Sequence, residues 1–76
     1  MATKKKDVDG VYRVTEVIGT SPNSWEDAAR NAVKTAGSTL RDLRIAEVTK
    51  LDVRIDEGGK IAQFRARLAL SFKYGG

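Results

Sequence analysis

The most constraining feature of this chain is a run of alternating apolar and polar residues near its carboxyl end. From Ala62 to Tyr74 every even position is apolar, and most odd positions are polar or charged, namely Gln63, Arg65, Arg67, Ser71 and Lys73. Successive side chains of a strand point to opposite faces, so the pattern predicts one long strand with a buried face and a charged face. Because thirteen residues exceed the usual five or six, we expect this strand to extend beyond its own core and to contact other copies of the chain.

With 76 residues, the chain has room for one domain. Residues 1–10 contain Lys4-Lys5-Lys6 and no apolar periodicity, which predicts a flexible basic N-terminal arm followed by one domain over residues 11–76. A domain this small usually needs disulfides, a metal or self-association for stability. The absence of cysteine and histidine excludes disulfides and the zinc and iron–sulfur sites built on those residues. Self-association is therefore expected.

Charge and hydropathy restrict the partners. No apolar run approaches the ~20 residues of a membrane-spanning helix and no signal-peptide pattern is present, which predicts a cytoplasmic protein with no membrane partner. The net charge of +4 favours a solvated arm and charged strand faces, with nucleic-acid binding as a distant alternative. An enzyme is not expected, because the serines at positions 21, 24 and 38 fit turns and caps and no nucleophile–base pair is evident.

The amino-terminal half predicts one strand and one helix. Residues 11–19 are rich in β-branched residues and end at a glycine, as a strand does. Ser24, with Asp27 three residues later, is a variant of the capping box and predicts the start of a helix. Alanines at helical spacing give this helix a thin apolar face. Gly37-Ser38 leaves open whether the helix continues or kinks there.

The carboxyl-terminal half predicts a hairpin. Residues 44–56 change phase along their length, which predicts a β-bulge near Thr49-Lys50. Gly58-Gly59 predicts a two-residue turn. That register places Asp52 opposite Arg65, on the side of the sheet away from the helix. The fold class is therefore α+β: a β-α-β-β chain whose three-stranded antiparallel sheet wraps on one helix, with the long last strand in the middle.

Several residues are candidates for binding, and each also has a structural interpretation. Gly19-Thr20-Ser21 precedes a helix start, where an anion can bind, but capping is the favoured role. Trp25 fits core packing better than ligand stacking. Asp52 and Asp56 flank the predicted turn and offer oxygen ligands to calcium, although their spacing alone favours solvated charge. Arg65 fits pairing with a carboxylate better than binding a phosphate.

Four segments together resemble the dodecin family. They are the strand VYRVTEVIGTS at residues 11–21, the alanine-rich helix, Ala46-Glu47-Val48 and the closing Ser71-Phe72. The resemblance covers about residues 11–74. It implies a β-α-β-β subunit assembled as a hollow homododecamer. For typical members it also implies that stacked pairs of flavin are bound and stored at subunit interfaces, without catalysis.

The chain departs from the flavin-binding pattern of that family at two positions. The resemblance places Ile45 where flavin-binding dodecins have a tryptophan that stacks on the isoalloxazine ring. It places Arg65 where they have a glutamine that contacts the ring. Isoleucine has no π face, so the ~0.5–1.5 kcal/mol of an aromatic pair is lost. Arginine adds a charge at a position of a neutral amide, so flavin binding is disfavoured.

Other segments are similar to a subgroup, the calcium dodecins, which also lack the flavin tryptophan. These segments are Gly19-Thr20-Ser21-Pro22, Ser24-Trp25-Glu26 and Gly59-Lys60-Ile61. Asp52 and Asp56 match that subgroup as well and are weak candidates for metal ligands. The resemblance therefore implies a non-enzymatic homo-oligomer that binds or stores a small ligand. A calcium-binding or purely structural shell is the alternative, and a basic protein associated with nucleic acid is a distant third.

Overall fold

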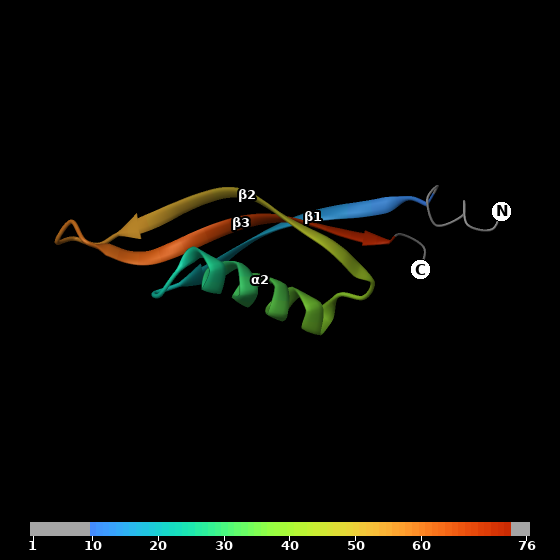
Figure 1. Cartoon of the computed structure of the whole chain (residues 1–76), viewed down its shortest axis with the longest axis horizontal. Coiled ribbons are helices and arrows are strands. Elements are labelled where there is room, and N and C mark those ends of the chain that lie inside the picture. Colours follow the sequence, from blue (N-terminus) through green and yellow to red (C-terminus); the bar gives the residue numbers. More distant parts are fainter. Residues whose placement is uncertain (1–9, 74–76) are drawn as a thin grey trace.

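The computed structural model describes residues 10–73, which form one helix and three strands (Figure 1). The elements follow the order β1 (Tyr12–Ser21), α2 (Trp25–Thr39), β2 (Leu43–Ile55) and β3 (Ile61–Lys73). All pairing is antiparallel and the strand order is β1-β3-β2. The predicted β-α-β-β topology with the long last strand in the middle is confirmed. Of the predicted arm, residues 1–9 lie outside the described residues, as does Tyr74.

Helix α2 begins at the predicted cap and continues without interruption through Gly37-Ser38. The Ser24 hydroxyl accepts a hydrogen bond from the Asp27 backbone N–H at 3.0 Å, which satisfies one of the donors left free at a helix start. At the other end, the Leu40 N–H donates to the Ala36 carbonyl at 2.9 Å. The predicted cap is confirmed, and the helix does not stop at its glycine.

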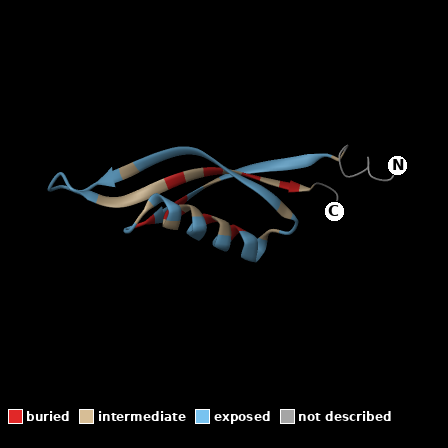
Figure 2. Ribbon diagram, in the orientation of Figure 1, coloured by how far each residue is buried: buried red, intermediate tan, exposed pale blue. Residues whose placement is uncertain are grey.

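The core lies between one face of α2 and the even positions of β3. Ala28, Ala32 and Ala36 form the buried face of the helix. The opposing buried side chains come from alternate positions of the central strand, namely Ala66, Leu68, Leu70 and Phe72. The alternation expected from the sequence is thus confirmed where the helix covers the strand. Figure 2 shows these buried positions along the side of α2 that meets the sheet.

Gly19 allows the helix to approach the sheet this closely. It lies on β1 opposite Ala66, and it is buried. A Cβ atom at this position would lie 2.0 Å from the Ala28 carbonyl oxygen and 2.8 Å from the Ala32 Cβ. No side chain fits in that space without displacing the helix backbone. The glycine and the helix alanines are therefore one packing unit.

Most of β2 lies outside this core. It is exposed along nearly its whole length, including the apolar Val48, Leu51 and Ile55 (Figure 2). The β2–β3 hairpin also projects beyond the start of α2 (Figure 1). The described chain has a radius of gyration of 15.9 Å, whereas a compact domain of this length has about 11 Å. The long strand therefore does extend beyond the core of its own chain, as expected.

The hairpin differs from the prediction at its turn. The predicted bulge is confirmed as a register shift between Val48 and Lys50. The two-residue Gly58-Gly59 turn is wrong, because the Asp56 carbonyl accepts from the Gly59 N–H at 3.0 Å and only Gly59 has a positive φ, 81°. This geometry is a type I turn followed by a left-handed residue.

The side chain of Asp56 favours this longer loop. Its Oδ1 accepts hydrogen bonds from the N–H groups of Gly58 and Lys60, at 2.9 and 3.0 Å. As a result Ile55 pairs with Ile61, whereas the predicted turn placed it with Ala62. Closer to the helix the predicted register is confirmed, with Leu51 opposite Ala66.

Substitution of Gly19 tests the close helix–sheet contact. We expect Gly19→Ala to lower the free energy of unfolding by about 1–3 kcal/mol or more, because the added methyl group overlaps a backbone carbonyl. Gly37→Ala is the matched control, since a Cβ there meets nothing within 4 Å and removing a helix glycine stabilises by roughly 0.5–1 kcal/mol. Urea unfolding at fixed protein concentration measures both. Equal effects of the two substitutions would contradict this packing account.

Candidate functional site

The face of the sheet opposite α2, here called the distal face, carries most of the polar side chains of the strands. Since directly paired residues share a face, the register sets out its rows across the three strands. From the hairpin toward the strand ends, the rows are Thr20–Arg65–Asp52, Ile18–Arg67–Lys50, Glu16–Ala69–Glu47 and Val14–Ser71–Ile45. The first three of these rows contain charged side chains, and the fourth, which is farthest from the hairpin turn, has aliphatic side chains on both edge strands.

The shortest side-chain hydrogen bond described on the distal face belongs to the predicted pair of Arg65 and Asp52. The Arg65 Nε donates to the Asp52 Oδ1 at 2.7 Å, and Nη2 donates to Oδ2 at 3.1 Å. This two-point geometry suits a planar guanidinium and a carboxylate. The side chains remain 36% and 50% exposed, respectively. The pair therefore orients Arg65 on an open surface.

The pair also affects the ionisation of Asp52. The hydrogen bond from Arg65 holds the pKa of the Asp52 carboxyl below its ordinary value of 3.8. The positive charges of Arg65, Arg67 and Lys50 act in the same direction, while partial burial opposes them. In turn, the hydrogen bond to Asp52 raises the pKa of Arg65. Both groups are charged at neutral pH.

Other arginines of this face also have partners within the chain. An Arg67 Nη1 lies 3.8 Å from the Glu16 carboxylate on β1. The Arg54 Nε donates to the Gln63 Oε1 at 3.1 Å. The face is therefore a network of paired side chains, with both signs of charge present.

Trp25 connects the helix start to the opposite side of the same hairpin. Its indole Nε1 donates to the Asp52 backbone carbonyl at 3.0 Å. Its ring meets Phe64 edge to face, with centroids 5.1 Å apart. The packing role predicted for Trp25 is confirmed, but this residue is still 38% exposed because the helix begins there and the hairpin projects beyond it. The hydrogen bond from Trp25 to Asp52 could not be predicted from the sequence, because the two residues are 27 positions apart.

The structure separates Ile45 and Arg65, the two positions predicted from the sequence to correspond to the flavin site of dodecins. Ile45 pairs with Ser71, whereas Arg65 lies six residues earlier on the same strand. At ~3.3 Å per residue the two rows are about 20 Å apart along β3. Both residues are on the distal face, and Ile45 is 57% exposed. One chain cannot bring both to a single small ligand, so a site that uses both positions takes them from two copies.

The two candidate metal ligands are likewise apart. Asp52 is engaged with Arg65 on the distal face, and Asp56 lies in the turn with its Oδ1 accepting two backbone hydrogen bonds. Between residues 10 and 73, no group of three or more acidic side chains is arranged to hold a metal ion. A calcium site on Asp52 or Asp56 would need further oxygen ligands from outside this part of the chain.

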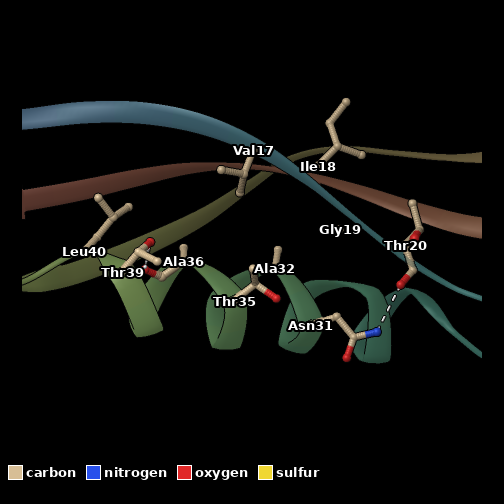
Figure 3. A pocket seen from close by; sticks show the side chains of 10 residues that line it. All are labelled: Val17, Ile18, Gly19, Thr20, Asn31, Ala32, Thr35, Ala36, Thr39 and Leu40. Carbon is tan, nitrogen blue, oxygen red and sulfur yellow. Dashed lines mark hydrogen bonds between the residues drawn. The ribbon is translucent and has the colours of Figure 1, made fainter.

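A groove between β1 and α2 is a further concave feature that the sequence did not indicate (Figure 3). Its volume is about 590 Å³. Gly19 lies at its floor, Val17 and Leu40 point into it, and Asn31 and Thr35 line its helix wall (Figure 3). The Asn31 Nδ2 donates to the Thr20 carbonyl at 3.0 Å and closes one end. Its lining has hydroxyl, amide and aliphatic groups but no charge.

The Gly19-Thr20-Ser21 segment at the end of this groove has the predicted structural role. Ser21 is buried, its hydroxyl donates to the Asp27 Oδ2 at 2.8 Å, and it accepts from the Asn23 N–H at 2.9 Å. These bonds connect the end of β1 to the first turn of α2. Ser21 is therefore a structural residue of the β1–α2 turn, and the helix cap itself is Ser24.

The order of elements and the thin helix on a sheet with a long central strand define a small α+β subunit, and its similarity to known proteins identifies its family. Residues 11–75 match the family model of dodecin. The chain belongs to the dodecin family. No helix in the described part of the chain is long and apolar enough to cross a membrane.

Individual relatives agree with this assignment. Over 63 residues the chain is 48% identical to the calcium dodecin of Mycobacterium tuberculosis, covering 83% of this chain and 87% of that protein. The crystal structure of that calcium dodecin, described as a calcium-chelating antigen with a calcium-binding site, superposes with a TM-score of 0.75. That superposition covers 83% of this chain and 89% of the other. The dodecin of Streptomyces coelicolor is 43% identical with a TM-score of 0.81, over 90% of this chain and 96% of that one.

The depressed pKa of Asp52 predicts how acid affects stability. A carboxyl whose pKa is lowered by folding stabilises the fold above its unfolded pKa, and that contribution is lost as pH falls through the folded pKa. Wild type should therefore unfold at higher urea than Asp52→Asn at about pH 7, and the difference should shrink below about pH 3.8, the ordinary value. A difference between the two proteins that does not change with pH would contradict the role of the Arg65 hydrogen bond.

Proposed function

We propose that this protein is a non-enzymatic homo-oligomer, a homododecamer in the manner of its family, that binds and stores a small ligand between subunits. The observation that carries the proposal is the separation of Ile45 and Arg65 by about 20 Å along β3 in one chain. Family membership makes both positions candidates for ligand contact. Because they lie on one exposed face, a shared ligand requires a second copy.

The exposed apolar surface supports assembly as well. Val48 and Leu51 on β2 and Trp25 at the helix start remain accessible in the single chain. Burying such side chains stabilises by about 25 cal/mol per Å² of apolar surface removed from water. A chain of 76 residues buries little apolar surface by itself and has no disulfide, so burial against its own copies would add to its stability. We infer a dodecin-like domain over residues 11–76 and a cytoplasmic location.

Flavin is disfavoured as the ligand by the side chains present. By register, Tyr12 is the one aromatic residue of the described strands on the distal face, and it pairs with Lys73 at the far end from Arg65. Ile45 offers an aliphatic surface there and no ring for stacking. Arg65 is already engaged with Asp52, so a neutral ring would meet an ion pair. The ligand is therefore expected to differ from the flavin of typical members.

Calcium is the second candidate ligand. The observation in its favour is the 48% identity to a protein named calcium dodecin. Asp52 and Asp56 are the candidate ligands in this chain, with carboxylate oxygens as calcium prefers. The Oδ2 of Asp56 is not used by the turn, whose bonds go to Oδ1. Since a calcium ion takes six to eight oxygens, a second copy or water would supply the rest.

One set of titrations compares the two ligands. Purified protein should quench riboflavin fluorescence weakly, and Ile45→Trp combined with Arg65→Gln should bind at least tenfold more tightly, about 1.4 kcal/mol, because a stacking ring is added and a charge removed. Val14→Trp with Arg65→Gln is the matched control, since Val14 lies in the same row as Ile45 on the other edge strand. In parallel, chelator-treated protein is titrated with Ca²⁺ by calorimetry, alongside Asp52→Asn and Asp56→Asn.

The outcomes separate the proposals. Tight flavin binding by the unmodified protein would overturn the exclusion of flavin. Failure of the Ile45→Trp combination to exceed the Val14→Trp control would show that these positions do not form the ligand site. Calcium binding that is lost in both aspartate variants would favour the calcium-binding shell. Calcium heat unchanged in both variants would remove Asp52 and Asp56 as ligands.

A further inference from the structure

The net positive charge of the described chain is concentrated at one end of the sheet. Residues 10–73 contain eleven basic and eight acidic side chains. Where β1 and β2 begin and β3 ends, four basic residues occur with one acid, Asp42; they are Arg13, Arg41, Arg44 and Lys73. The seven basic and seven acidic side chains elsewhere balance each other. We call these four basic residues the basic end.

The topology brings these residues together from three parts of the sequence. Arg13 on β1 pairs with Phe72, and Leu43 on β2 pairs with the same Phe72 from the other side. Tyr12 pairs with Lys73 in the next row. At ~4.8 Å between neighbouring strands, the basic end covers a width of about 10 Å. The basic end and the β2–β3 turn lie at the two opposite ends of the long axis of the molecule (Figure 1).

Specific interactions hold the basic end in shape. The Lys73 N–H donates to the Asp42 carbonyl at 3.2 Å, which ties the α2–β2 connection to the last residue of β3. Asp42 adopts a positive φ of 58° to make this contact. The Arg13 guanidinium lies 6.0 Å from the centroid of the buried Phe72 ring, a cation–π distance. The Arg13 guanidinium therefore lies against the core, and the backbone of Lys73 is fixed to the α2–β2 connection.

The charges at this end differ from those on the distal face in their pairing. Arg65, Arg67 and Arg30 each lie within 4 Å of a carboxylate. Among residues 10–73, the exposed Arg13, Arg41 and Arg44 form no such ion pair. These arginines lie on the two edge strands, β1 and β2, and in the connection before β2, at the same end of the sheet. An anionic partner that crosses this end would neutralise them.

We propose that the basic end binds the phosphate backbone of nucleic acid without regard to base sequence. Three of its four residues are arginines, whose planar guanidinium groups bind phosphate through two points. The exposed ring of Tyr12 beside Lys73 adds a surface on which a base of a single strand can stack. The sequence made nucleic acid only a distant alternative, because three of the lysines lie in the N-terminal arm and solvated charge was the favoured interpretation. Tyr12 and Lys73 form the row next to Ile45 on the distal face, whereas Arg13 lies on the helix side of the sheet with Phe72, so the two sites meet at this end.

The test uses the full chain and a labelled single-stranded oligonucleotide, with binding followed by fluorescence anisotropy. Three phosphate contacts, one from each arginine of the basic end, predict that the logarithm of the affinity falls with the logarithm of salt with a slope of about −2.1, from ~0.7 per contact. Arg41→Gln with Arg44→Gln should weaken binding at least tenfold and reduce the slope to about −0.7. Lys50→Gln with Arg54→Gln removes the same charge from the balanced region and should change affinity less than twofold. Both double variants retain Lys4-Lys5-Lys6.

Three results would overturn the proposal. Equal losses in the two double variants would mean that overall charge alone attracts the oligonucleotide. No binding by wild type at low salt would remove the interaction. Stronger binding to vesicles of anionic lipid, lost in the same Arg41/Arg44 variant, would assign the basic end to a membrane surface. Circular dichroism and light scattering check each variant, and if the double variant loses structure, Arg41→Gln against Lys50→Gln makes the same comparison.

Discussion

The close approach of α2 to the sheet is the constraint on which the rest of this structure depends. Gly19 and the alanines of the helix remove the side chains that would otherwise hold the two layers apart. A helix packed this closely is thin, and it covers the end of β1 and the second half of β3 while leaving β2 exposed. The close packing of α2 therefore gives this short chain its core, and it also leaves β2 of the β2–β3 hairpin exposed.

The distal face shows how charge is distributed over the uncovered sheet. Arg65 and Asp52 form a two-point pair, and Arg67 lies near Glu16 on the other side of β3. These pairs link all three strands through the central one. They also leave the aliphatic Ile45 at one end and the charged pair at the other, so a ligand that contacts both positions has to lie between copies of the chain. Binding of such a ligand therefore depends on assembly of the chain with its copies.

Much of the fold could be predicted from the sequence because its local signals agree with the tertiary structure. The alternation of β3, the cap at Ser24 and the phase change of β2 each have a single physical interpretation, and each is found. The hairpin turn was predicted incorrectly because glycine pairs suit several turns. The choice among them depended on the Asp56 carboxylate, whose two backbone hydrogen bonds are not visible in a pattern of residue types.

The candidate site was only partly accessible to the same reasoning. Strand register was enough to pair Asp52 with Arg65. The bond from Trp25 to the Asp52 carbonyl, the groove beside Gly19 and the basic end each combine residues that are far apart in sequence. No periodicity relates such residues, so only the folded chain shows them together. The distance between Ile45 and Arg65 is of the same kind, and it shapes the proposed function most.

We expect this subunit to complete its core and its ligand site only with other copies of itself. Light scattering of the purified 8.3 kDa chain at micromolar concentration measures the size of the particle. Assembly in the manner of the family predicts a particle of twelve chains, which is twelve times 8.3 kDa or about 100 kDa. It also predicts that this mass persists on dilution, since the exposed apolar surface of β2 would be buried in the particle. A stable, folded monomer or dimer under these conditions would contradict the account.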